Sequence, residues 1–298
     1  MNAAWLPLVV ALPLLASALT AAAPWRVVRL VLLLGTPLAT AVVGVWLIGI
    51  HRETPVLATN VGGFPVGIAI PFVSDTLSAV LLAVTGIATF VVLLFAVRTG
   101  EDRLRFFPAL VLMLVAGVNG AFLTGDLFNL FVFFEVMLAA SYALMLHGSG
   151  TLRVRAALHY IAVNLTASLC FLIGVAILYG VTGTLNMADL AVRVAELDAA
   201  RRPLLLAGAS ILGVAFLVKA AMWPVCFWLP VTYVAAAPPV AAIFAGMSKV
   251  GFYVILRLSM LVFPAGVGPA GGFGAHLLVA GGFATLAFGM IGVLASKG

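Results

Sequence analysis

The sequence predicts an all-α integral membrane protein, a multi-span helical bundle of about nine transmembrane helices. Two observations carry this prediction: 65% of the residues are hydrophobic and only 8% are charged, and apolar runs of about twenty residues, long enough to cross a bilayer, recur along the chain. A third is that most arginines fall in the polar gaps between these runs. The net charge of +6 therefore comes from arginines between the spans, which set the orientation of the protein in the bilayer, and it does not indicate nucleic-acid binding.

The apolar runs define the expected spans. They lie at 3–22, 26–50, 73–97, 106–124, 127–147, 156–180, 204–233 (broken), 238–263 and 276–295. The first run has no basic segment before it, so we expect a retained helix and not a cleaved signal. Segment 51–72, rich in Gly and Pro, is expected to form an ordered external loop.

The arginines predict the orientation. The gaps after the first, third and fifth spans are basic and fall on one side, which the positive-inside rule makes cytoplasmic; the N-terminus is then outside. Segment 183–203 departs from this rule, because it carries Arg193, Arg201 and Arg202 on the outer side. Its acidic residues indicate an amphipathic segment that lies on the membrane surface. We expect a multi-pass membrane protein.

Two of the three lysines, Lys219 and Lys249, lie inside apolar runs. A guanidinium keeps its proton at any accessible pH, whereas a desolvated ammonium can release it, so Lys in these places favours proton chemistry. Lys249 follows Pro238 by eleven residues, about 16 Å along a helix and near the middle of a bilayer. The alternative is that both side chains extend to the interface, and this depth argues against it.

Two prolines follow Lys219. Pro224 and Pro230 each remove a backbone donor, so we expect the helix to break just after the lysine. Broken helices inside a membrane are tolerated where their free carbonyls face protein or water, and such ends often form ion sites.

Glu135 is the acid that belongs with these lysines. It follows Asp126 by nine residues, which places the two carboxylates on opposite faces of one helix, and Asp126 is better explained as the N-cap of that helix. In a Glu–Lys pair inside the membrane, the mutual attraction keeps the Glu deprotonated and the Lys protonated. Separating the two residues removes this attraction, so the pair can act as a switch for protons. A static buried salt bridge is the alternative.

The remaining polar residues and the cysteines give weaker indications of a functional site. His159 lies in the sixth span near Tyr160 and Asn164, where it could extend a hydrogen-bonded wire or simply pack between helices. Cys170 and Cys226 have no partner at metal-ligand spacing. We find no nucleotide loop, metal cluster or activated nucleophile, so we expect no cofactor, no metal and no enzyme chemistry of the chain's own.

Three runs of sequence resemble one family closely. Residues 125–135 read GDLFNLFVFFE, residues 183–190 read GTLNMADL, and residues 219–257 contain Lys219, the Trp-Pro and Leu-Pro pairs, and Lys249. They are similar to the D-type subunit of the Mrp-type multisubunit cation/proton antiporters, which is homologous to the proton-pumping antiporter-like subunits of respiratory complex I. The resemblance covers essentially the whole chain.

The resemblance implies an antiporter-like fold. Residues 1–105 would form three N-terminal helices, 106–263 one complete five-helix repeat with a broken seventh helix, and 264–298 the start of a second repeat. Members of the family are roughly two thirds longer, so the sequence is expected to be a fragment or a truncated product. The partners implied are the other subunits of the complex and the bilayer.

The resemblance also implies roles. Glu135, Lys219 and Lys249 would carry protons, with Asp126, His159, Tyr253 and Arg257 as secondary candidates. The function expected is a membrane subunit of a Na⁺/H⁺, or K⁺/H⁺, antiporter. The alternatives are a proton-pumping subunit of complex I or of a membrane-bound hydrogenase, and a structural scaffold without transport.

Overall fold

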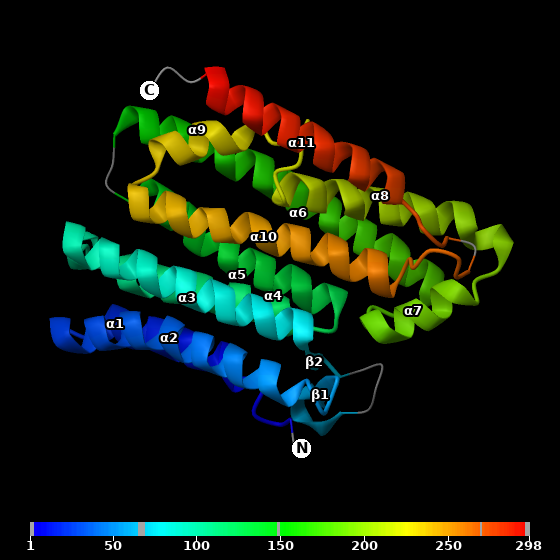
Figure 1. Cartoon of the computed structure of the whole chain (residues 1–298), viewed down its shortest axis with the longest axis horizontal. Helices are drawn as coiled ribbons and strands as arrows, with labels where there is room; N and C mark the ends of the chain where they lie inside the picture. The colour runs from blue at the N-terminus through cyan, green and yellow to red at the C-terminus, as the bar shows by residue number, and fades with distance from the viewer. Residues whose placement is uncertain (1–2, 65–68, 148–149, 269, 296–298) are drawn as a thin grey trace. The chain divides into compact units, whose positions relative to one another are not determined.

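The computed structural model describes residues 3–64, 69–147, 150–268 and 270–295 (Figure 1). It is built from helices, with one small sheet. The helices are α1 (Leu8–Ala22), α2 (Arg26–Ile50), α3 (Thr76–Thr99), α4 (Phe107–Leu123), α5 (Leu127–Leu146), α6 (Thr151–Thr182), α7 (Met187–Ala195), α8 (Arg202–Lys219), α9 (Trp228–Ala235), α10 (Pro238–Leu261) and α11 (Ala275–Ala295). The strands are β1 (Val56–Asn60) and β2 (Pro71–Asp75), and short 3-10 turns lie at Val61–Gly63, Glu101–Arg103 and Ala199–Arg201.

The helical membrane protein predicted from composition is confirmed. Among the residues that the structure describes, seven helices are long and apolar enough to cross a bilayer, namely α2, α3, α5, α6, α8, α10 and α11. The first and fourth expected spans correspond to α1 and α4, which are apolar but have only 15 and 17 residues. Of the nine expected spans, seven therefore contain a helix that is long enough to cross a bilayer, and two contain a shorter apolar helix.

The segment expected as an external loop contains the sheet. β1 pairs with β2 in antiparallel register, Val56 opposite Asp75 and Asn60 opposite Pro71. His51 is buried and joins the end of α2 to this hairpin, because its Nε2 lies 2.9 Å from the Ser74 hydroxyl. The predicted helical architecture therefore holds, and this two-stranded sheet is an addition that the sequence did not indicate, because its strands show no clear alternation of polar and apolar residues.

The chain divides into two compact units. The first contains Met1–Ala157 and Ala235–Met247, and the second contains Leu158–Val234 and Ser248–Gly298. Each is described here by itself.

In the first unit, α4 is the central helix. Fifteen of its 17 residues are buried, and it packs against α1, α2 and α5. Asn119 of α4 donates to the carbonyl of Val9 at 3.0 Å and to the hydroxyl of Thr40 at 3.1 Å, which ties three helices together. α2 and α3 approach closely at Gly86, where a Cβ would lie 2.6 Å from the amide of Ala41. Small residues at such crossings are typical of membrane helices.

The two ends of α2 carry different structures. At its first residue, Arg26 pairs with the buried carboxylate of Asp102 at 2.9 Å. At its far end lies the hairpin, which also contacts the turn before α5, because the amide of Gly125 donates to the carbonyl of Pro71 at 2.9 Å. Within this unit Arg26 and Asp102 therefore lie at the end of α2 opposite to the hairpin.

In the second unit, α6 packs against α8 and α9. Phe171 and Phe216 meet edge to face at 4.8 Å, and Tyr160 lies 5.4 Å from Trp228. α11 has no buried residue; the hydroxyl of its Thr285 accepts from the amide of Trp223 at 2.9 Å.

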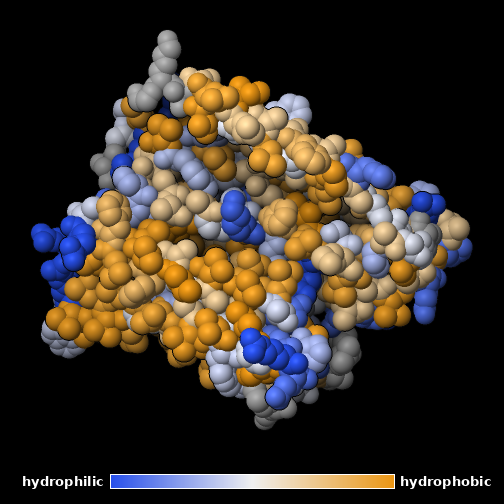
Figure 2. Space-filling view, viewed as in Figure 1, coloured by the Kyte–Doolittle hydropathy of each residue, from blue (hydrophilic) through white to orange (hydrophobic). Residues whose placement is uncertain are grey.

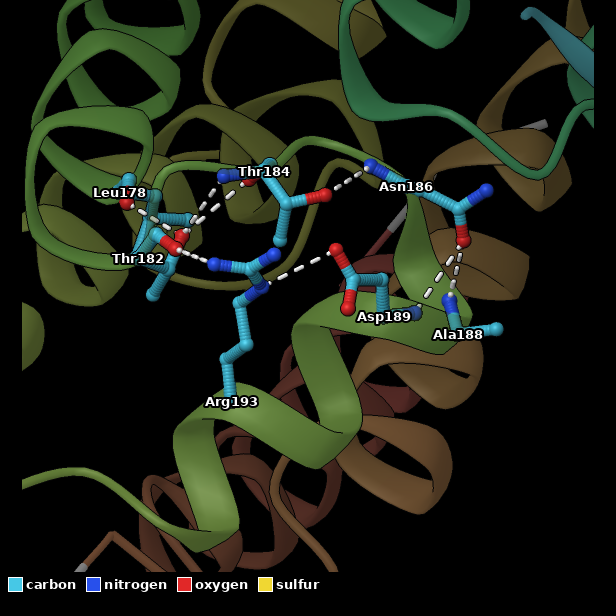
Figure 3. A network of polar contacts seen from close by, with 7 residues as sticks. All are labelled: Leu178, Thr182, Thr184, Asn186, Ala188, Asp189 and Arg193. Carbon is cyan, nitrogen blue, oxygen red and sulfur yellow. Dashed lines mark hydrogen bonds and ion pairs between the residues drawn. The ribbon is translucent and has the colours of Figure 1, made fainter. Parts of the chain in front are cut away.

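The turn from α6 into α7 is held by a polar network (Figure 3). α6 ends before Gly183, whose φ of +73° suits glycine, and Asn186 caps α7 by accepting from two amides. Arg193 donates to the Asp189 carboxylate at 3.0 Å and to the carbonyl of Thr182 at 3.1 Å. α7 is amphipathic, as expected for this segment, with its apolar residues Met187, Leu190 and Val194 buried. Its place on the membrane surface stays a prediction.

Apolar side chains cover most of the face that Figure 2 shows. Many of the exposed large residues lie on the long helices; those of α1 are Leu8, Leu12, Leu14, Leu15 and Leu19. Exposed apolar surface of this extent is typical of a protein whose solvent is lipid.

Candidate functional site

The site is centred on the end of α8. This helix ends at Lys219, and the chain then runs without helix through residues 220–227, where Ala221 has a φ of +54°. α9 starts at Trp228, two residues before Pro230. The break therefore begins directly after the lysine, as its two prolines had indicated.

One carbonyl at this break accepts two hydrogen bonds. The indole N–H of Trp228 donates to the carbonyl oxygen of Val218 at 3.0 Å, and the amide of Ala221 donates to the same oxygen at 3.0 Å. Trp228 is 5% exposed and stacks against Tyr160 of α6. The indole therefore uses the second lone pair of this carbonyl and ties α9 to the end of α8.

Lys219 is buried, with 5% of its surface exposed. Its Nζ donates to the hydroxyl oxygen of Ser168 at 3.1 Å, and Ser168 itself is 3% exposed. A lysine at the centre of a membrane helix costs about 3 kcal/mol or more if it stays charged, so a hydroxyl acceptor at this distance stabilises the ammonium.

Gly251 allows α10 to touch the broken helix. A Cβ at this residue would lie 2.6 Å from the amide nitrogen of Ala220 and 2.8 Å from the carbonyl carbon of Lys219. Real Cβ atoms do not approach backbone this closely, so glycine is required here. The backbone of α10 thus packs directly on the end of α8.

Lys249 lies two residues before this contact. It is the twelfth of the 24 residues of α10, so it lies in the middle of the span, as its distance from Pro238 had indicated. Unlike Lys219, it is exposed on the surface of the chain. The two lysines therefore occupy different environments within the second unit.

Glu135 belongs to the first unit. It is the ninth of the 20 residues of α5, partly exposed, beside the buried Phe133, Phe134 and Met137. Asp126 caps this helix, because its carboxylate accepts from the amide of Asn129 at 2.8 Å. Burial raises the pKa of the Asp126 carboxyl, and the amides of Asn129 and Phe128 partly oppose this shift. Capping, the preferred explanation of Asp126, is what the structure shows.

The secondary candidates make local contacts. Both Nε and a terminal nitrogen of Arg257 donate to the hydroxyl of Tyr253, at 3.1 and 2.8 Å, and the guanidinium also lies over its ring. His159 is exposed, 5.8 Å from the ring of Phe227. The amide of Asn164 donates back to the carbonyl of Tyr160 at 3.0 Å, within its own helix, and a role of His159 in a wire stays a prediction.

Three residues of this site were missed by sequence reasoning, or not given a role. Ser168, Trp228 and Gly251 act through contacts with residues far from them in sequence, so no local spacing marks them. Within the part of the chain that the structure describes, no three His, Cys, Asp or Glu side chains gather as metal ligands.

Comparison with known proteins gives consistent results. The D-type subunit of a probable K(+)/H(+) antiporter of Rhizobium meliloti is 57% identical over 238 residues, which is 80% of this chain and 44% of that protein. The D-type subunit of the Na(+)/H(+) antiporter of Alkalihalophilus pseudofirmus is 42% identical over 231 residues, 75% of this chain and 46% of that protein. The chain thus spans about half the length of these relatives.

Solved structures share the fold. A chain of the Mrp complex from Dietzia sp. DQ12-45-1b superposes with a TM-score of 0.82 at 40% identity, covering 87% of this chain and 49% of that one. A chain of the membrane-bound sulfane sulfur reductase, an archaeal respiratory membrane complex, superposes with a TM-score of 0.78 at 28% identity, covering 86% and 53%.

The family itself is identified by a sequence profile. The profile described as NADH:quinone oxidoreductase/Mrp antiporter, TM matches residues 124–296, which include α5, the broken helix and both intramembrane lysines. This is more than half of the chain. The chain therefore belongs to the NADH:quinone oxidoreductase/Mrp antiporter transmembrane family, with D-type antiporter subunits among its relatives.

Proposed function

We propose that this chain is part of the D-type subunit of an Mrp-type antiporter complex that exchanges Na⁺ or K⁺ for protons, and that Glu135, Lys219 and Lys249 carry the protons. The observation that carries the proposal is Lys219: a buried amine at the end of a broken membrane helix, with a hydroxyl 3.1 Å from its Nζ. The proposed cation and the proposed complex rest on the relatives, which are named as subunits of K(+)/H(+) and Na(+)/H(+) antiporters.

The chemistry follows from the two states of the amine. As an ammonium, Lys219 donates to Ser168; as a neutral amine, it can accept from the same hydroxyl, because a serine O–H rotates to suit its partner. The lysine can therefore lose and regain a proton without leaving a buried polar group unpaired. Burial disfavours the charged form and so brings the two states closer in free energy.

The midspan positions of the other two residues fit the same role. Glu135 and Lys249 each lie near the middle of a membrane helix, where ionisable residues are rare and commonly mark ion or proton paths. The membrane potential supplies about 2.3 kcal/mol per charge per 100 mV, comparable to a change of one to two units in the proton affinity of such a group.

The test is Lys219→Arg in the complete complex. A guanidinium keeps the charge but cannot release the proton, so we expect cation-driven proton flux in inverted vesicles to fall to the level of vesicles that lack the complex. The reverse exchange at the other end of the same helix, Arg202→Lys, is the matched control and should retain flux, because Arg202 is exposed. Flux retained by Lys219→Arg with normal assembly would refute the proton-releasing role.

A second function has a specific observation in its favour. The fold likeness to the sulfane sulfur reductase chain is consistent with a proton-pumping subunit of a redox complex. Copurification separates the two: flavin or iron–sulfur absorbance in the purified complex supports the redox assembly, whereas exchange that depends on Na⁺ or K⁺ without such absorbance supports the antiporter.

A further inference from the structure

A small cavity, partly open, lies in the first unit among α2, α3, α4 and the first half of α10. Its volume is about 20 Å³. A cavity must offer about 10–15 Å³ to hold one water molecule, so this one has room for a single water. Four polar side chains line it, those of Thr40, Thr85, Thr89 and Asn119.

The amide of Asn119 presents an acceptor to this cavity. Asn119 is 1% exposed, and its Nδ2 donates to the carbonyl of Val9 at 3.0 Å and to the hydroxyl of Thr40 at 3.1 Å. These two bonds use both hydrogens of the amide and fix which end is oxygen. Among the described residues, the Oδ1 of Asn119 has no donor.

The threonines of α3 present complementary groups. The hydroxyl of Thr85 donates to the carbonyl of Leu81 at 2.6 Å, which leaves its oxygen able to accept. The hydroxyl of Thr89, one turn further along, has no partner among the described side chains and backbone groups, so its O–H is available to donate. The cavity therefore offers two acceptors and one donor on two facing helices.

We propose that this cavity binds one water molecule, which donates to Oδ1 of Asn119 and to the hydroxyl oxygen of Thr85 and accepts from the hydroxyl of Thr89. Buried waters typically make about three such bonds. The water would bridge α3 and α4 where no direct polar contact joins these three groups. It would also hydrate the part of α10 formed by Ile243, Gly246 and Met247, which line the same cavity.

The lining argues against a monovalent cation as the occupant. No carboxylate faces the cavity, and one of its oxygens, that of Thr40, already accepts from Asn119 and donates to the carbonyl of Thr36. A desolvated cation would keep its charge inside the membrane with too few oxygens to replace its hydration. A neutral water has no such requirement.

Radiolytic hydroxyl-radical labelling tests the proposal, because radicals made from a bound water oxidise the side chains beside it. The measurement uses the assembled complex in lipid nanodiscs and compares two methionines by mass spectrometry. Met247 lines the cavity at 7% exposed, whereas Met145 is 0% exposed and does not line it. We expect Met247 to be oxidised at least about five times faster than Met145; equal rates would overturn the proposal.

Two variants make the test specific. A Cβ added at Gly246 meets no atom within 4 Å, so Gly246→Ala should occupy the space of the water and lower Met247 labelling to the level of Met145. The matched control is Gly213→Ala on α8, which also meets no atom within 4 Å and should leave labelling unchanged. Thr89→Val removes only the donor and should lower labelling as well.

The same experiment separates water from a cation. Replacing Na⁺ and K⁺ by choline should leave Met247 labelling unchanged. Labelling that depends on either ion would overturn the water site in favour of a cation. Labelling that persists in both Gly246→Ala and Thr89→Val would overturn it in favour of access from outside the cavity.

Discussion

At the scale of residues, the clearest feature is a buried amine that donates to a hydroxyl group. Lys219 has a hydroxyl as a partner in α6, and a hydroxyl can bond to either state of the amine. A carboxylate at the place of Ser168 would hold the ammonium charged, and a methyl group would remove this hydrogen bond. Serine is the side chain that stabilises the buried lysine without fixing its protonation state.

This gives a prediction for Ser168. In Ser168→Ala the ammonium loses this hydrogen bond, which is worth about 1.5–3 kcal/mol for a charged group, so the charged state of the lysine should be less stable. We expect the pH profile of proton flux in vesicles to move about one unit toward acid, with assembly unchanged. Ser168→Thr keeps the hydroxyl and should keep the profile; an unmoved profile in the alanine variant would contradict the pairing.

The sequence could predict some residues of this site and not others. Lys219, Pro224 and Pro230 lie within twelve residues, so a charge beside a helix break is visible without a structure. Ser168 precedes Lys219 by 51 residues and resembles many serines that pack between helices. Its contact depends on how α6 meets α8, which is a property of side-chain packing and not of local pattern.

At the scale of elements, close approach of helices decides the geometry of the site. α10 can touch the end of α8 only because Gly251 has no side chain. The expected span limits matched the helices to within a few residues, because apolar length and loop charge mark the ends of membrane helices. The hairpin between α2 and α3 was missed because its pairing is not local and its sequence lacks alternation.

Gly251→Ala should therefore displace α10 from the break. The added Cβ would meet the amide of Ala220 at 2.6 Å, and overpacking of this kind costs about 1–3 kcal/mol. We expect a lower melting temperature of the purified complex and proton flux reduced about tenfold or more. Gly180→Ala adds the same methyl group on α6 where no atom lies within 4 Å, and it should change neither measurement.

The network at the start of α7 should respond to acid. The hydroxyl of Thr184 and the guanidinium of Arg193 hold the pKa of the Asp189 carboxyl below its usual range. Because the folded-state pKa is lowered, the stabilisation is present at neutral pH and is lost as pH falls through that lower value.

Asp189→Asn tests this. We expect the variant to melt about 1 to 2 °C below the unaltered protein at pH 7, since the pair is exposed and worth little, and the difference to shrink as the pH falls below the usual range of a carboxyl group. A difference that stays constant from pH 7 to pH 3 would mean that the charge of Asp189 does not contribute. Glu196→Gln, in which the altered carboxylate has no bond in the network, is the matched control and should show no such dependence.

At the scale of the whole molecule, the arginines of segment 183–203 have an explanation. Arg193 donates to the carbonyl of Thr182, and Arg201 donates to that of Val181 at 3.4 Å. Both carbonyls belong to the last turn of α6, where the negative end of the helix dipole attracts cations. These arginines cap a helix, so they do not count against an orientation that is set by the basic gaps elsewhere.

This assignment predicts which surface each gap faces. With Cys170 and Cys226 replaced by alanine, single cysteines can be placed at Leu152, which is 83% exposed beside the basic start of α6, and at Val192, which is 55% exposed on α7. In intact cells a membrane-impermeant maleimide should label the cysteine at 192 and not the one at 152, because residue 192 faces outward in this assignment and residue 152 faces the cytoplasm. Lysis should make both react equally. Labelling at 152 in intact cells, with none at 192, would reverse the orientation and would return the arginines of segment 183–203 to the cytoplasmic side.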